Sequence, residues 1–220
     1  RGGRHVEGDA EKFLLPTLAQ LHDKDIDFDA MGITVCSIAG TNFAPYVQLL
    51  GPKGLDIPFV VLTDFDPKGE AVSQEDADPG DGGVNEGYGK NRVVNQIMQH
   101  ILDADAWKKN DFAQVMKLAP EHGVFLNDFT FEIDVFEAGA EKQFLAAIQK
   151  LTTNKKMHAR FADLCLDPNS LEPAQFLKDI DSIGKGRVAQ RLASVLMEDS
   201  VDVCPTYIKS ALGYLKAKLK

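Results

Sequence analysis

The sequence has 220 residues, of which 44% are hydrophobic and 26% are charged, and its formal net charge is −9. This length is sufficient for one large domain, or for a core with a small subdomain. No apolar run approaches the roughly 18 residues of a membrane-spanning helix, which excludes an integral membrane protein. The acidic balance argues against generic nucleic-acid binding, but it does not exclude a local site where carboxylates bind cations.

Strand-like and helical patterns alternate in the first third of the chain. After a short apolar piece that predicts a first strand, apolar residues recur at helical spacing, with Asp9 as the predicted N-cap. A continuous β-rich run predicts a buried strand at residues 33–38, and "TNFAPYVQLL" predicts a short helix. The next buried strand is predicted at residues 59–62, within "DIPFVVLTDFD".

The rest of the chain is mainly helical in pattern. Residues 70–86 have the Gly, Asp, Glu and Pro content of an exposed acidic loop, and a helix is predicted from Asn91 to Trp107. "HGVFLN" and "FTFEIDVF" are short strand candidates. From Ala138 onward almost every segment is helical in pattern.

This order of elements predicts the fold class. Continuous apolar strands that alternate with helices are typical of parallel βαβ units, and function in such sheets lies at the carboxyl ends of the strands. Acidic residues occur at these ends: Glu7 follows the first strand, and Asp64 and Asp66 follow the third. We therefore expect an α/β protein with a Rossmann-type core, a mostly parallel sheet and a site at this edge.

The acidic residues indicate a metal site. Glu7 and Glu11 are four residues apart at a helix start, Asp64 and Asp66 point to one side of an extended segment, and Glu132 lies in a third segment. Such oxygen ligands suit Mg²⁺ or Mn²⁺, and two metals roughly 4 Å apart would support phosphodiester displacement. Each residue also has a simpler interpretation. Glu11 alone is a solvated helix residue, and Glu132 alone is the outer side of an edge strand.

The motifs together resemble a known family. "VEGDAEKFLLPTLAQ", "VCSIAGTNFAPYVQLL", "IPFVVLTDFD", "TFEIDVF" and "GKGRVAQRLA" are similar, in this order, to the Toprim nuclease region of the OLD (overcoming lysogenization defect) family. An EGxxE followed by a DxD is the general Toprim pattern. The Thr-Phe-Glu segment and the late Lys-Gly-Arg helix start favour OLD proteins over primases and topoisomerases.

The resemblance implies metal-dependent DNA cleavage by a two-metal mechanism. The wide spacing of the three cysteines separately indicates reduced thiols and the cytoplasm as the expected compartment. Two Mg²⁺ or Mn²⁺ ions per site would be held by five carboxylates, with a hydroxyl assisting. Glu7 and Asp64 would also be catalytic, and Lys185 would stabilise charge that develops at the scissile phosphate. The expected metal ligands are Glu7, Glu11, Asp64, Asp66, Thr130 and Glu132.

The resemblance also implies a domain organisation. We expect a Toprim catalytic core at residues 1–137, a helical subdomain at 138–183 and C-terminal helices at 184–220, the first of which returns Lys185 to the active site. OLD proteins usually carry an ABC-type ATPase domain before this region, so we expect the chain to be a C-terminal fragment. The oligomeric state of such a fragment stays open.

DNA is the expected partner, although the contact surface is less defined than the metal site. A solvated basic face is an equally good interpretation of each basic cluster, and the acidic loop would repel DNA. The candidate phosphate contacts are Lys155, Lys156, Arg160, Arg187 and Arg191.

Other functions stay open at this point. Primer synthesis or topoisomerisation would use the same core, but no tyrosine lies in a motif for strand passage. A non-catalytic module that binds metal, or that resembles a phospho-receiver, would also have acidic residues at strand ends. Cys36, Cys165 and Cys204 lack CxxC spacing, which indicates reduced thiols, with Cys36 expected in a strand.

Overall fold

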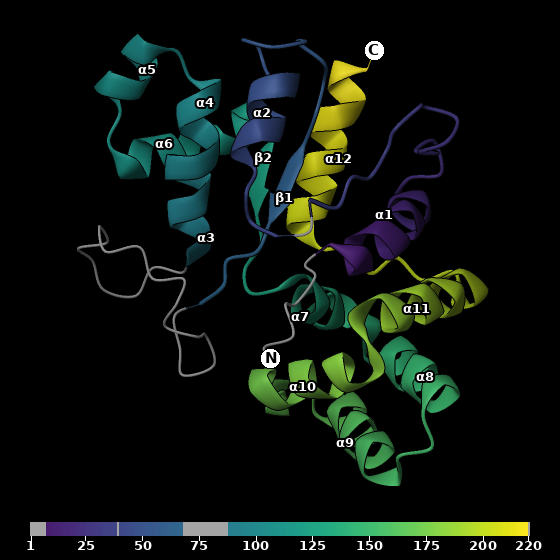
Figure 1. The fold of residues 1–220 in the computed structure, drawn as a ribbon. Coiled ribbons are helices and arrows are strands. Elements are labelled where there is room, and N and C mark those ends of the chain that lie inside the picture. Colours follow the sequence, from purple (N-terminus) through teal and green to yellow (C-terminus); the bar gives the residue numbers. More distant parts are fainter. Residues whose placement is uncertain (1–7, 39, 68–87, 220) are drawn as a thin grey trace. The chain divides into compact units, whose positions relative to one another are not determined.

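The computed structural model describes residues 8–38, 40–67 and 88–219, which form two compact units (Figure 1). Unit 1 comprises the described residues of Arg1–Gly40 and Phe131–Pro205, and unit 2 those of Thr41–Thr130 and Thr206–Lys220. Each unit is therefore built from segments that are far apart in the sequence. The expected boundaries at residues 137 and 184 both fall inside unit 1.

Unit 2 contains a small parallel sheet, as the apolar strands predict. Strand β1 (Val61–Thr63) pairs with β2 (Val124–Leu126), and Val61 lies opposite Val124 in the register. The predicted strand at residues 59–62 therefore overlaps β1, and the strand candidate "HGVFLN" contains β2. Parallel pairing brings the carboxyl ends of both strands to one edge.

Helices cover both faces of this sheet. The helical run formed by α3 (Tyr88–Asn91), η2 (Arg92–Met98) and α4 (Gln99–Ile101) shares a buried cluster with Val61 and Val124. Helix α12 (Thr206–Lys218) packs on β2, where the Tyr214 and Phe125 rings meet edge to face at 6.2 Å. Successive strand residues point to opposite faces of a sheet. Val124 therefore faces the helical run and Phe125 faces α12.

The remaining helices of unit 2 are short. They are α2 (Ala44–Leu50), α5 (Ala104–Lys109), α6 (Phe112–Leu118) and the 3₁₀ turn η3 (Ala119–His122). The helix predicted from Asn91 to Trp107 is wrong in its middle, because Leu102 is extended and Asp103 starts a new helix as its N-cap. A capping side chain thus ends one helical pattern and begins the next.

Unit 1 is helical in its described residues. It contains α1 (Asp9–His22), α7 (Phe131–Val135), η4 (Phe136–Ala140), α8 (Glu141–Leu151), α9 (Lys155–Leu166), η5 (Pro168–Ser170), α10 (Pro173–Ile183) and α11 (Lys185–Asp199). Helix α11 packs on α1, α8 and α10. Four phenylalanines hold the centre together, with neighbouring ring centroids 5.1–5.7 Å apart: Phe136, Phe144, Phe161 and Phe176.

Three local predictions are wrong in unit 1. Residues 33–38 form no strand among the described residues, and Cys36 is exposed there. "FTFEIDVF" contains helix α7, whose residues are all buried. The sequence Phe-Glu-Ile-Asp-Val alternates apolar and acidic residues, and this period of two is typical of a strand. Helix α1 begins at Asp9, and Gly8 takes the N-cap position.

No helix in the described part of the chain has the length and apolar character that crossing a bilayer requires. The three cysteines are free thiols, as their spacing predicts.

Candidate functional site

The carboxyl ends of β1 and β2 carry the first group of predicted site residues. Asp64 directly follows β1, and Asn127 directly follows β2. The Asn127 amide donates to Asp64 Oδ1 at 2.5 Å, and its own carbonyl oxygen accepts the Phe65 backbone N–H at 2.6 Å. Asn127 is only 4% exposed, so this buried amide fixes both the backbone and the carboxylate of the acidic turn.

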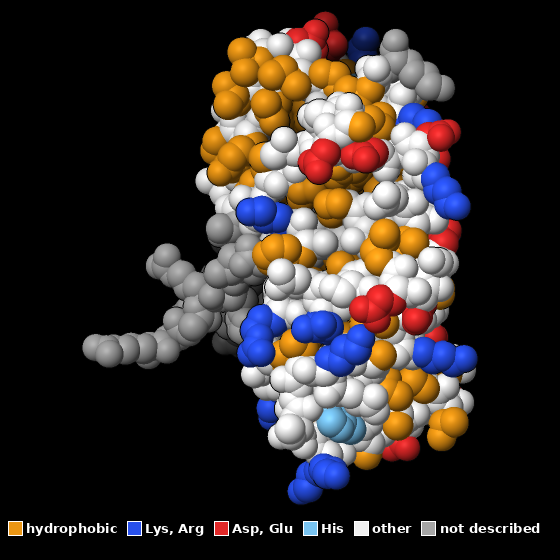
Figure 2. Space-filling model, turned by 90° about the vertical axis from the view of Figure 1, so that its right-hand side faces the viewer, with side chains coloured by type: hydrophobic (Ala, Val, Ile, Leu, Met, Phe, Trp, Pro, Cys, Tyr) orange, Lys and Arg blue, Asp and Glu red, His pale blue; other side chains and the backbone are white. Residues whose placement is uncertain are grey.

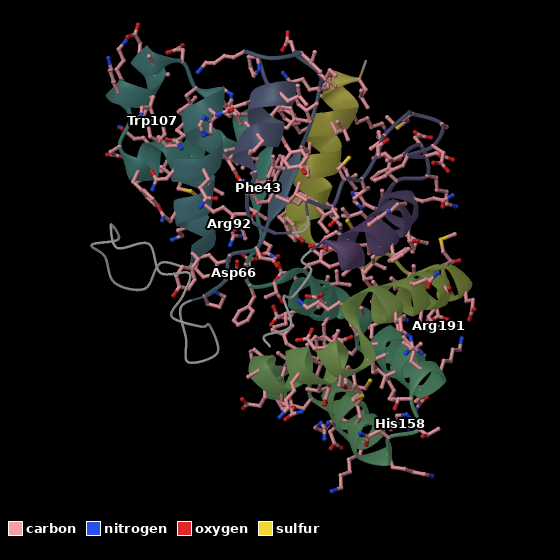
Figure 3. All side chains as sticks on the ribbon, in the orientation of Figure 1. Phe43, Asp66, Arg92, Trp107, His158 and Arg191 are labelled. Carbon is pink, nitrogen blue, oxygen red and sulfur yellow. The ribbon has the colours of Figure 1, made fainter. Side chains whose placement is uncertain are left out.

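A buried arginine holds the second aspartate. Arg92, on η2, donates to Asp66 Oδ2 at 2.7 Å, and Figure 3 shows the two labelled side chains next to each other. Its other terminal nitrogen donates to Thr63 Oγ1 at 2.8 Å and to the Asp64 carbonyl at 3.3 Å. The guanidinium therefore bridges the strand end, the turn backbone and the Asp66 carboxylate.

The backbone of the acidic turn is equally constrained. Asp66 has a φ of 49°, in the left-handed region, and its carbonyl accepts the N–H of Tyr88 at 3.1 Å. The Gly89 N–H donates to the Phe65 carbonyl at 2.9 Å. A Cβ on Gly89 would stand 2.8 Å from Phe65 Cα and would collide with the Asp64 carbonyl, so only glycine fits where α3 meets the turn.

Thr130 supplies an unusual oxygen atom in unit 2. Its side chain is buried, and Oγ1 has no hydrogen-bond partner among the described residues. Buried hydroxyl groups are normally paired, because leaving one unsatisfied costs free energy. An orphan oxygen of this kind fits a position where a bound ion or its water would be the partner.

Unit 1 contains three other predicted residues, and two of them, Glu132 and Lys185, lie close together. Glu132, in α7, is 7% exposed, and its Oε1 lies 3.4 Å from Lys185 Nζ. Lys185 is the first residue of α11, and Gly184 before it has a φ of 103°, which turns the chain into the helix. Glu11 lies in the first turn of α1, which packs on both α7 and α11.

The glycine of the EGxxE motif is required by a close approach. Gly8 has a φ of 120°, and a Cβ on it would come within 2.8 Å of Ser37 Cβ. The start of α1 therefore lies directly against the segment at residues 33–38 that the sequence predicts as the second strand. Glu7 lies outside the described residues.

The donor set suits a hard divalent cation in its chemistry. The described predicted ligands offer only carboxylate oxygens and the orphan Thr130 hydroxyl, which match Mg²⁺ or Mn²⁺ and not zinc. Within the part of the chain that is described, no three His, Cys, Asp or Glu side chains cluster closely enough to hold a metal by themselves. Asp64, Asp66 and Thr130 belong to unit 2, and Glu11, Glu132 and Lys185 to unit 1.

Known proteins identify the family. The model of the "Overcoming lysogenization defect protein-like, TOPRIM domain" matches residues 5–66, from before Glu7 to Asp66. The C-terminal region of the Burkholderia pseudomallei OLD protein is 38% identical, with a TM-score of 0.80, over 98% of this chain and 96% of that one. The chain belongs to the OLD family. The C-terminal region of the Xanthomonas campestris pv. campestris OLD protein is 36% identical, with a TM-score of 0.74, over 97% and 93% of the two chains. The comparison with curated proteins gives no match.

The OLD Toprim fold accounts for the small parallel sheet and the large helical content. Toprim domains generally bind divalent metals, which agrees with the oxygen donors that the chain offers.

Two of the predicted DNA contacts in this OLD chain line one hollow. Arg187 and Arg191 are four residues apart on α11, and with Gln190, Ser194 and Leu151 they line a hollow of about 350 Å³. Both arginines are exposed, and Arg191 is labelled on α11 in Figure 3. Figure 2 shows blue Lys and Arg side chains close together on the lower part of its face.

The other three predicted contacts differ in their surroundings. Lys155 and Lys156 are exposed in the first turn of α9, where a helix dipole disfavours cations. Arg160 instead forms a two-point ion pair with the buried Asp179, at 2.8 and 2.6 Å. This hydrogen bond raises the pKa of Arg160 above its ordinary value. Its guanidinium is therefore already engaged inside unit 1.

Sequence reasoning missed Asn127 and Arg92. Asn127 had a signal, since it follows a predicted strand and the carboxyl ends of parallel strands lie at one edge. Arg92 had a weaker signal: it is a single cation at the start of the apolar run "VVNQIM".

Proposed function

We propose that this chain is the nuclease module of an OLD protein, a Mg²⁺- or Mn²⁺-dependent endonuclease that hydrolyses phosphodiester bonds in DNA. The observation that carries the proposal is the acidic turn after β1, where Asn127 and Arg92 hold the Asp64 and Asp66 carboxylates. The Asp66 N–H donates to the carbonyl of Phe129, and the next residue, Thr130, has the orphan hydroxyl. Arg92 offsets the charge of Asp66, and a bound cation would offset the remaining repulsion between the two carboxylates at this sheet edge.

The proposed metal ligands are Glu7, Glu11, Asp64, Asp66, Thr130 and Glu132. When bound, two divalent cations supply an activated water and neutralise charge on the leaving oxygen.

Lys185 has a separate role in this proposal. It approaches the scissile phosphate, and in the absence of substrate Glu132 Oε1, 3.4 Å from Lys185 Nζ, keeps the ammonium group oriented. A positioned cation of this kind stabilises charge that develops in the transition state. Arg187 and Arg191 bind flanking phosphates, and Lys155, Lys156 and Arg160 are further candidates. In the whole protein, an N-terminal ABC-type ATPase domain is the proposed partner of this module.

Plasmid cleavage tests the proposal. Supercoiled DNA is incubated with the chain in Mg²⁺, Mn²⁺, Ca²⁺ or EDTA, and the parent is compared with Asp64→Ala and Lys185→Ala. We expect cleavage in Mg²⁺ or Mn²⁺ that falls by at least about 100-fold in both variants, because each removes an electrostatic group of the reaction. Lys150→Ala is the matched control, since Lys150 also pairs with a glutamate in unit 1, at 3.1 Å, but lies outside the proposed site.

Two outcomes would contradict this function. Cleavage that persists in Asp64→Ala would mean that the site is wrongly placed. Metal that stabilises the chain against heat without any cleavage would favour the non-catalytic metal-binding module instead.

A further inference from the structure

We propose that Arg92 is the positioning residue of the acidic turn: it holds Asp66 in the orientation that binds metal. The inference rests on the proposed function, because it assigns a role to a residue beside the proposed ligands. Arg92 is 8% exposed and spans three acceptors, Thr63 Oγ1, the Asp64 carbonyl and Asp66 Oδ2.

The geometry of the side chain explains why an arginine is needed. One terminal nitrogen contacts the strand end and the turn backbone, while the other contacts the carboxylate. A guanidinium is planar and rigid, so fixing one nitrogen fixes the other, whereas a lysine ammonium is a single point. Asp66 is thereby tied to the strand through a side chain as well as through its own backbone.

The positive charge of Arg92 and its positioning of Asp66 have opposite expected effects on metal affinity. A cation close to Asp66 repels a second cation by Coulomb's law, so charge alone predicts that Arg92 weakens metal binding. Partners that orient a metal ligand act in the other direction, and their removal typically lowers metal affinity about 10–100-fold. Because Arg92 is buried and fixed at both ends, positioning outweighs repulsion in this proposal.

The test is Mn²⁺ binding to the folded chain, measured by titration calorimetry for the parent, Arg92→Gln, Arg92→Lys and the control Lys117→Gln. Lys117 is an exposed lysine of the same unit, so its substitution removes the same charge far from these contacts in sequence. We expect the affinity to fall about 10–100-fold in Arg92→Gln and to recover only partly in Arg92→Lys. In an Asp66→Asn background, Arg92→Gln is expected to lower the Mn²⁺ affinity no further, because Arg92 acts through Asp66.

Circular dichroism establishes that each variant is folded before titration. If Arg92→Gln does not fold, Thr63→Val removes one acceptor of Arg92 and keeps the charge, and a several-fold loss of Mn²⁺ affinity is expected. Binding by Arg92→Gln as tight as in the parent, or tighter, overturns the inference and leaves the proposed function intact. A parent that binds no Mn²⁺ overturns both.

Discussion

Gly89 lies where helix α3 meets the backbone of the acidic turn. A methyl group on it would stand 2.8 Å from both Phe65 Cα and Leu126 Cδ1. Neither atom can withdraw freely, because Phe65 is held by Asn127 and Leu126 belongs to β2. Gly89→Ala is therefore expected to lower the free energy of unfolding by about 1–3 kcal/mol, the usual effect of overpacking.

The matched control for Gly89→Ala is Gly213→Ala, measured by urea unfolding in EDTA. Gly213 lies in α12 of the same unit, and a Cβ there meets no atom within 4 Å. Replacing it should raise the free energy of unfolding by up to about 1 kcal/mol, since alanine favours helices. Equal effects of the two substitutions would show that helix propensity, and not the contact with the turn, decides the result.

Candidate site residues could be identified from the sequence where they belong to a motif. The aspartates and the late lysine follow from spacing and from the family pattern, and the structure places Lys185 beside Glu132. Asn127 and Arg92 were not identified, because their roles depend on side chains that meet across 63 residues (Asn127 and Asp64) and 26 residues (Arg92 and Asp66) of chain. Such contacts are set by the sheet register and by helix packing, neither of which a local pattern contains.

At the scale of elements, caps decide where helices begin. The Asp103 carboxylate accepts the N–H groups of Asp105 and Ala106 at the start of α5. The bond from the Ala106 N–H lowers the pKa of Asp103 below its ordinary value of 3.8, with smaller effects from Asp105, Lys53 and Lys109. The ionised cap thus stabilises the fold above the ordinary pKa, and this contribution is lost as the pH falls through the lowered value.

Asp103→Asn tests this pH dependence. Asparagine keeps the capping oxygen at every pH but carries no charge. The parent should be more stable than the variant near pH 7, and the difference should shrink as the pH falls from about 5 toward 3. Urea unfolding of both proteins over this range measures the difference. A difference that stays constant down to pH 3 would contradict an ionised cap with a lowered pKa.

Element types were predicted well where length or flanking residues decided between helix and strand. The long helices of unit 1 and the two parallel strands were predicted correctly. The segment Phe131–Val135 was predicted wrongly, because its apolar and acidic residues alternate with the period of a strand. Both acidic residues are buried in the helix, which a local pattern does not reveal.

The division of the whole molecule into units could not be predicted from the chain order. The described parts of Arg1–Gly40 join Phe131–Pro205, and Thr206–Lys220 joins Thr41–Thr130. Contacts such as the edge-to-face pair of Phe125 and Tyr214 link segments that no local pattern relates. The expected boundary at residue 137 rests on the helical pattern that begins at Ala138, and such a pattern does not say which helices rejoin the core.

Net charge is the remaining property of the whole molecule that bears on function. At −9, the chain repels DNA on average, so any affinity for DNA must come from local cations that release counterions. Arg187 and Arg191 are exposed and line one hollow, which makes them the best-placed pair in unit 1. Each phosphate contact contributes about −0.9 to the slope of log affinity against log salt concentration.

Substituting both arginines with glutamine should therefore reduce the magnitude of this slope by about 2, with weaker binding at every salt concentration. Fluorescence anisotropy with a labelled duplex, in Ca²⁺ without Mg²⁺ or Mn²⁺, measures the slope for each protein. The double variant Lys108→Gln/Lys117→Gln removes the same charge from exposed positions of unit 2 and should leave the slope nearly unchanged. If the two double variants shift the slope equally, the effect is one of net charge, and DNA does not contact the hollow on α11.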